Sequence, residues 1–186
     1  SAFTIQPVKA AGGTIYIRAD GSVDPPGAPL LSIDNVTYTF TGNINDSIVV
    51  ERDNIVVDGA GYTVRGTGSV KGIDLSGRSN VTVKNMEIKN FGMAIFLKNA
   101  HNNTIVGNKV TNQDLGGGHG VVIVTYSNNN TISGNDITNN DYGIWLEHFS
   151  NNNVISGNFV TNNEVGVEIY GTSSDNTVSG KNVKNN

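Results

Sequence analysis

The sequence contains no cysteine, and only 4 of its 186 residues are proline. The lack of cysteine excludes disulfide bonds and thiolate metal sites, and it leaves the redox compartment open. No apolar run approaches the roughly 20 residues of a membrane-spanning helix. Basic residues are scarce too: 12 Lys and Arg stand against 16 Asp and Glu, and the net charge is −4. Without a basic stripe, nucleic acids and anionic membranes are disfavoured as partners.

A tandem repeat occupies residues 129–170. The segment NNTISGNDITNNDYGIWL is followed by NNVISGNFVTNNEVGVEI, and four aliphatic positions recur at an offset of 23 residues, for example Ile132 and Ile155 (155 − 132). Short β-branched runs separated by Asn and Gly at such a period are typical of a parallel β-solenoid with three strands in each coil. The steps between strands are too short for helices, which disfavours a leucine-rich repeat.

Extending the period in both directions predicts four columns of inward-facing aliphatic residues. Because these side chains would be buried, the columns are expected to hold the fold together. The first column is Val57, Val83, Ile105, Ile132, Ile155 and Val178, and the second is Val64, Ile88, Val110, Ile137, Val160 and Val183. The third strand supplies two: Ile73, Ile95, Val121, Ile144 and Val167, and beside them Leu75, Leu97, Ile123, Leu146 and Ile169.

Small and amide residues also recur with the period. Small residues precede the third strand, where we expect a sharp bend in the chain: Gly72, Ala94, Gly120, Gly143 and Gly166. An asparagine column follows the second strand: Asn90, Asn112, Asn139, Asn162 and Asn185. Asparagine tolerates left-handed backbone conformations, and stacked amides can hydrogen-bond between coils. We therefore interpret this column as structural.

The chain before the repeats is less regular. Residues 1–47 are predicted to form short strands and a proline-rich loop that act as a cap or assembly segment, and residues 48–186 to form the β-helix repeats. Strands are expected in FTIQPV, TIYI, Val36–Thr41 and Ser47–Glu51, and an irregular loop at Asp20–Pro29.

The motifs NIVVDGAGYTV, NVTVKNMEIKNF and NNTISGNDITNNDYGIWL resemble the right-handed parallel β-helix family of secreted carbohydrate-associated proteins, and within it the NosD-like branch of archaeal and bacterial surface proteins. The resemblance implies an all-β, right-handed parallel β-helix of about six regular coils, an extracellular or cell-surface location, and contact with polysaccharide. Some NosD-like members are associated with copper. Here His101, His119 and His148 share no ligand spacing, so we expect no metal and no cofactor.

An outward strip on the third strand is the main candidate site. It combines aromatic and carboxylate side chains, which suit sugar rings and a protein interface equally, and a purely stabilising stack remains a lesser alternative. The candidate binding residues are Phe96, Tyr126, Trp145, Glu147, His148, Phe149, Glu168 and Tyr170.

Two features bear on catalysis. The third coil carries four extra residues within QDLGGGHG (Gln113–Gly120), where Asp114 and His119 suggest a binding loop, although a tolerated surface insertion is favoured. Glu147 and Glu168 are 21 residues apart (168 − 147), two short of the period, so they do not form an equivalent pair. We therefore expect a non-catalytic structural or adhesion module, with a polysaccharide lyase or epimerase as the alternative.

The ends of the solenoid raise the question of assembly. The last coil, with Val178 and Val183, lacks a third strand within the sequence. The strand Phe3–Val8, with apolar Phe3, Ile5 and Val8, is a candidate to pair with this edge in another copy, which would give a head-to-tail fibre. The alternative is that the sequence comes from a longer solenoid.

Overall fold

The computed structural model describes residues 13–66, 71–113, 117–180, 182–184 and 186. The expected strand Phe3–Val8 lies outside these residues, as do Asp114 and Asn185. The described residues form strands and turns without a helix, so among them no helix could cross a membrane.

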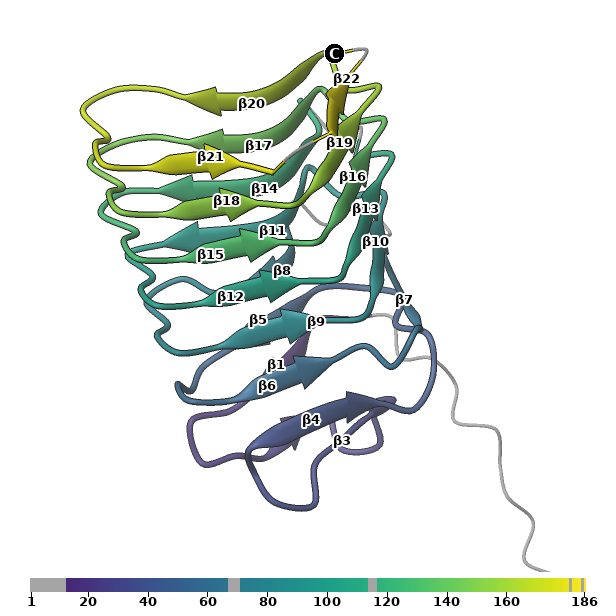
Figure 1. Cartoon of the computed structure of the whole chain (residues 1–186). Coiled ribbons are helices and arrows are strands. Elements are labelled where there is room, and N and C mark those ends of the chain that lie inside the picture. The colour runs from purple at the N-terminus through teal and green to yellow at the C-terminus, as the bar shows by residue number, and fades with distance from the viewer. Residues whose placement is uncertain (1–12, 67–70, 114–116, 181, 185) are drawn as a thin grey trace, which may run out of the picture.

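The strands form three sheets that run along the molecule (Figure 1). Sheet A contains, in spatial order, β2 (Val23–Asp24), β1 (Ile15–Ile17), β5 (Ile48–Val50), β8 (Lys71–Asp74), β11 (Met93–Lys98), β14 (His119–Val124), β17 (Tyr142–Leu146) and β20 (Val165–Ile169). Sheet B contains β21 (Thr177–Ser179), β18 (Val154–Ser156), β15 (Thr131–Ser133), β12 (Thr104–Val106), β9 (Thr82–Lys84), β6 (Val56–Asp58), β4 (Thr37–Phe40) and β3 (Leu30–Leu31). Sheet C contains β22 (Asn182–Lys184), β19 (Phe159–Thr161), β16 (Asp136–Thr138), β13 (Lys109–Thr111), β10 (Glu87–Lys89) and β7 (Thr63–Arg65).

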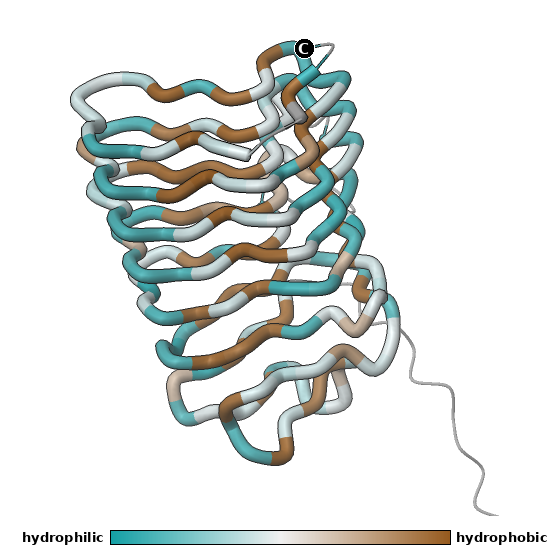
Figure 2. Tube along the Cα trace, in the orientation of Figure 1, coloured by the Kyte–Doolittle hydropathy of each residue, from teal (hydrophilic) through white to brown (hydrophobic). Residues whose placement is uncertain are grey.

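Each regular coil contributes one strand to each sheet, and the predicted right-handed parallel β-helix of about six coils is confirmed. Its aliphatic columns stack in the expected register: Ile132 pairs with Ile155, Ile155 with Val178, and Ile144 with Val167. Figure 2 shows apolar and polar residues alternating along the strands. Since alternate side chains point inward, these columns form one continuous core as far as Val160. At the C-terminal end the predicted burial fails, because Ile169, Val178 and Val183 are exposed.

Three columns of amides also line the interior, and their members are buried except for Asn176 and Asn186 at the C-terminal end. At Asn130, Oδ1 accepts hydrogen bonds from the backbone N–H and Nδ2 of Asn103 at 2.9 and 3.0 Å, while Nδ2 donates to Ala100 O and Asn153 Oδ1 at 2.9 and 3.0 Å. Such amide ladders satisfy both the side chains and the turn backbone. The ladders comprise Asn103, Asn130, Asn153 and Asn176; Asn108, Asn135 and Asn158; and Gln113, Asn140, Asn163 and Asn186.

These ladders are not the column predicted from the sequence. Asn90, Asn112, Asn139 and Asn162 do adopt the expected left-handed backbone, with φ between 55° and 63°. Their side chains, however, lie toward solvent, and the hydrogen-bonded amides occupy neighbouring positions. The predicted left-handed backbone is therefore correct, but the predicted hydrogen bonding of stacked amides belongs to the neighbouring columns.

The small residues before the third strand also act differently from the prediction. They lie within strands rather than at bends, and the next coil passes close to them. A Cβ on Gly143 would lie 2.5 Å from Gly166 O and 2.8 Å from Val160 Cγ1. At Gly143 a neighbouring backbone occupies the space of a side chain, whereas the equivalent position of an earlier coil accommodates Ala94.

The N-terminal section is joined to the regular coils. Strand β1 pairs in parallel with β5, and β4 with β6, whereas β2 and β3 add antiparallel strands at this end. The Asp20–Pro29 segment, predicted to be an irregular loop, contains the short strand β2. Tyr38 and Phe40 are buried in the same core as the aliphatic columns.

Acid is expected to destabilise the fold through Glu87 on sheet C. Hydrogen bonds from Lys89 and Lys109 (2.9 and 3.1 Å), with the Thr63 hydroxyl, lower the pKa of Glu87 from 4.5 to about 2. Because the lowered pKa means that the folded state stabilises the ionised carboxylate, Glu87 contributes to the free energy of unfolding. This contribution is complete above pH 4.5 and is lost as the pH falls toward 2. Thermal melts across this range should show a weaker acid dependence for Glu87→Gln, and parallel curves for the two proteins would contradict the assignment.

Candidate functional site

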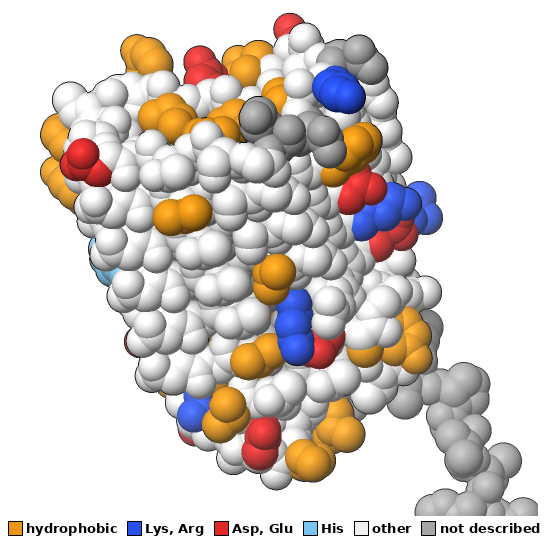
Figure 3. Space-filling model, viewed as in Figure 1, with side chains coloured by type: hydrophobic (Ala, Val, Ile, Leu, Met, Phe, Trp, Pro, Cys, Tyr) orange, Lys and Arg blue, Asp and Glu red, His pale blue; other side chains and the backbone are white. Residues whose placement is uncertain are grey.

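The three outer faces of the helix differ in chemistry. Sheet B presents short side chains along β12, β15 and β18, and the face seen in Figure 3 carries few charges there. Sheet C presents the ion pairs of Glu87 with Lys89 and Lys109. Sheet A presents aromatic rings, so it is the face best suited to a ring-shaped ligand.

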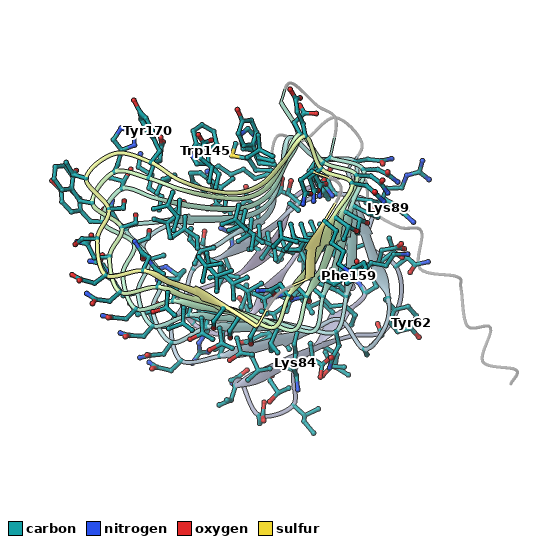
Figure 4. The ribbon with its side chains drawn as sticks, turned by 45° about the horizontal axis from the view of Figure 1, so that its top comes forward. Tyr62, Lys84, Lys89, Trp145, Phe159 and Tyr170 are labelled. Atoms are coloured by element: carbon teal, nitrogen blue, oxygen red, sulfur yellow. The ribbon has the colours of Figure 1, made fainter. Side chains whose placement is uncertain are left out.

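Register aligns the outward residues of sheet A in three columns. One contains Met93, His119, Tyr142 and Val165; the next contains Phe96, Val122, Trp145 and Glu168; the third contains Lys98, Val124, Glu147 and Tyr170. Neighbouring members of a column lie about 4.8 Å apart, the spacing of paired strands. Figure 4 shows Trp145 and Tyr170 projecting from one side of the coil, with Lys89 on a second side and Lys84 on the third.

His119, Tyr142 and Trp145 form an aromatic stack on this face. The ring centroids of His119 and Trp145 are 4.5 Å apart at an interplanar angle of 20°, and those of His119 and Tyr142 are 5.0 Å apart at 8°. All three side chains are partly exposed. The stack thus combines a flat apolar surface with polar atoms at its edges.

The electrostatics of His119 favour a neutral imidazole. Burial lowers its pKa, outweighing the Gly117 carbonyl and the carboxylates of Asp141 and Glu147, which act to raise it. Nδ1 contacts the Gly117 carbonyl oxygen, which can only accept, so we infer that Nδ1 carries the proton. Nε2 is then a hydrogen-bond acceptor.

Two polar atoms of the aromatic stack have no partner. Both His119 Nε2 and Trp145 Nε1 are covered, and neither makes a hydrogen bond. Covered polar atoms are nearly always paired, because leaving one unpaired costs about 1–3 kcal/mol. The aromatic stack therefore contains one unpaired acceptor and one unpaired donor, both covered.

The predicted strip is divided into separate groups. Tyr126 and Phe149 stack on each other at the turn beyond sheet A, with ring centroids 5.3 Å apart. Phe96 lies beneath Lys71, whose Nζ is 3.9 Å from the ring centroid, and Val122 separates Phe96 from Trp145 in their column. Trp145 instead joins His119 and Tyr142, of which Tyr142 was not predicted as a site residue.

The turn bearing Tyr126 and Phe149 has an unusual backbone. Thr125, Tyr126, His148 and Phe149 all have positive φ values between 53° and 58°. Side chains other than glycine and asparagine rarely adopt this conformation, which costs of order 1–3 kcal/mol. The surrounding coils therefore hold the backbone of this turn in a conformation that places the two rings side by side.

The two predicted glutamates lie in different columns, as their spacing indicated. Glu168 pairs in register with Trp145, and Glu147 follows Trp145 by two residues on the same outer face. The Glu147 side chain is 17% exposed and Oε1 lies 2.9 Å from His148 Nδ1. Both carboxylates therefore flank the aromatic stack.

Two surface hollows lie elsewhere on the molecule, and the described residues contain no cluster of metal ligands. Hollows of about 420 and 330 Å³ lie near Met86 and Lys109, and near Leu31 and Thr39, away from sheet A's outer face. In the part of the chain that the structure describes, no three His, Asp or Glu side chains are grouped to hold a metal ion.

Comparisons with known proteins identify the fold family. Curated protein sequences give no match to the chain. Among solved structures, the enzymatically active domain of tailspike protein 2 of bacteriophage CBA120 is similar, with a TM-score of 0.54 and 16% sequence identity over 74% of this chain. The chain spans 24% of that domain's length, and this likeness concerns the fold alone. The family model of the right-handed β-helix region matches residues 15–183, and the chain therefore belongs to the right-handed β-helix family.

Proposed function

We propose that this protein is a non-catalytic extracellular or cell-surface adhesion module of the NosD-like branch, which contacts polysaccharide through the aromatic stack. The observation that carries this proposal is the stack itself, with its unpaired acceptor on His119 and unpaired donor on Trp145. Sugar rings present an apolar face together with hydroxyl groups, and partly exposed aromatic rings complement both.

The open position of the stack supports contact with a polymer. The rings lie on the outer face of a long sheet, and the stacked Tyr126–Phe149 pair provides a second aromatic surface at the adjoining turn. A chain of sugars can contact both surfaces at once, which strengthens binding because the second contact is intramolecular. The tailspike likeness supports the fold and carries no activity over to this chain.

Replacing Trp145 by alanine is expected to weaken glycan binding by at least about tenfold, because the largest ring of the stack is lost. Binding should be measured on immobilised neutral, amino and uronic polysaccharides. Phe159→Ala is the matched control, since Phe159 is an aromatic residue that is 47% exposed on sheet C. Equal effects of the two substitutions would argue against the aromatic stack as the binding site.

The same panel separates adhesion from catalysis. A binding module should bind a neutral polysaccharide without shortening it, and Glu147→Gln should change this binding little. Polysaccharide turnover that Glu147→Gln abolishes would instead assign the lyase or epimerase alternative.

Head-to-tail association is a second, separate proposal. It is supported by apolar side chains at the last coil: Ile169, Val178 and Val183 are 41%, 41% and 39% exposed. The strands β20, β21 and β22 are also the outermost strands of their sheets. Such edges favour strand addition, and electron microscopy of the intact chain would test for filaments.

A further inference from the structure

Four carboxylates surround the aromatic stack and give this surface negative charge. We call Asp141, Glu147, Glu164 and Glu168 the acidic rim. Asp141 and Glu147 lie on the coil of Trp145 and both act electrostatically on His119. Glu164 and Glu168 lie on the next coil, where Glu168 is the register partner of Trp145.

Cationic side chains do not balance the acidic rim. Among the described residues, Glu164 and Glu168 have no ion-pair partner. Lys98 precedes Glu147 by two strands, roughly 10 Å along the column at the usual strand spacing. Lys71 is engaged by Asp74 at 2.8 Å, and in the described part of the chain the basic side chain beside the rim is His148, 2.9 Å from Glu147. Carboxylates therefore outnumber cationic side chains around the stack.

We propose that the aromatic stack and the acidic rim bind an amino sugar with a free ammonium group, of the glucosamine class. This inference rests on the proposed glycan binding and narrows it to one class of ligand. An ammonium group over an indole ring gains a cation–π attraction, and a nearby carboxylate adds a charge-assisted hydrogen bond. Uronic acids would be repelled by the same carboxylates.

The unpaired atoms of the stack fit the same ligand. His119 Nε2 accepts a hydrogen bond, which an ammonium or hydroxyl group of the sugar donates. Trp145 Nε1–H donates to a sugar hydroxyl oxygen. Both atoms are covered, so binding requires a small rotation of the partly exposed indole, which the new hydrogen bonds favour.

The test compares oligosaccharides of equal length built from glucosamine, N-acetylglucosamine and galacturonic acid. Calorimetry at about pH 6 keeps the carboxylates ionised and the amines protonated. The glucosamine oligomer should bind about tenfold more tightly than the N-acetylated one. This advantage should shrink between about 0.01 M and about 1 M salt, as the Debye length falls from about 30 Å to about 3 Å.

Glu168→Gln isolates the charge. It should reduce the glucosamine advantage by about threefold or more and leave binding of the N-acetylated oligomer unchanged. Asp34→Asn is the matched control, because it removes the same charge from an exposed position between β3 and β4 and keeps an oxygen for the N–H groups of Val36 and Thr37. Circular dichroism melts should show that both variants fold.

Each outcome bears on one of the two proposals. Equal binding of the glucosamine and N-acetylated oligomers, or an advantage that survives Glu168→Gln, would overturn the amino-sugar assignment and leave glycan binding standing. Spermidine that displaces the glucosamine oligomer at equal concentration would show that charge alone is recognised, which also overturns it. Failure of every oligosaccharide to bind would remove the proposed function itself.

Discussion

Substitution of Asn130 by alanine is expected to destabilise the protein by about 3 kcal/mol, which corresponds to a fall of about 6–12 °C in Tm for a chain of this size. The change removes four hydrogen bonds from a fully buried side chain. It leaves the backbone N–H of Asn103 and the carbonyl oxygen of Ala100 without these partners in the interior. Differential scanning calorimetry would measure the change.

Asn129→Gly is the matched control for this prediction. Asn129 adjoins Asn130 but is exposed and has a φ of 59°, a conformation that glycine adopts freely. Its substitution should change stability by no more than about 0.5 kcal/mol. Similar melting temperatures for both variants would show that the buried amides contribute no more than their exposed neighbours.

Replacement of Gly143 by alanine should be more damaging, with a loss of about 4 kcal/mol or more, or failure to fold. The new Cβ would meet Gly166 O at 2.5 Å and Val160 Cγ1 at 2.8 Å. Neither neighbour can move without displacing the adjoining coil, because backbone and core are tightly packed. Soluble yield and urea unfolding would report the effect.

Gly42→Ala provides the comparison. A Cβ on Gly42 would find its nearest neighbour, Pro29 Cβ, at 3.5 Å, which is an ordinary contact. This change should leave stability within about 1 kcal/mol of the original and favours folding by restricting the unfolded chain. If Gly143→Ala and Gly42→Ala have the same free energy of unfolding, the close approach of the coils does not explain the glycine at position 143.

The aliphatic columns could be predicted because two periods determine them. Side chains alternate along each strand, and the clearest repeats are offset by 23 residues, so the stacking of Ile155 on Ile132 follows from counting. Where the offset differs, as between Ile105 and Ile132, the Asn and Gly residues that flank each strand indicate the register. Burial depends little on the fine geometry of each side chain. This part of the fold was therefore accessible from sequence alone.

The sequence does not show directly which asparagines join the buried ladders, because asparagines with different roles are adjacent in the chain. Asn139 and Asn140 are adjacent, yet one provides a left-handed turn and the other joins a ladder. The signal that separates these roles is Gln113, which occupies the ladder position. Glutamine offers the same amide without asparagine's tolerance of left-handed backbone, so its presence indicates a hydrogen-bonding role.

The aromatic stack was only partly predictable. His119 and Tyr142 are 23 residues apart (142 − 119) and share a column, which the extra residues before His119 disguised. Trp145 belongs to the next column, and its ring reaches His119 across the face of the sheet. Contacts between columns depend on side-chain rotamers, which a repeat pattern does not specify.

The amide ladders have a direction. Each coil offers its amide oxygens to the preceding coil and its backbone N–H groups to the following one, as Asn130 does between Asn103 and Asn153. The side of a coil that faces the preceding coil presents acceptors, and the side that faces the following coil presents donors, so the two sides are complementary. A duplicated coil would therefore meet matching surfaces on both sides, and the length of the molecule can change during evolution in whole coils without a new interface.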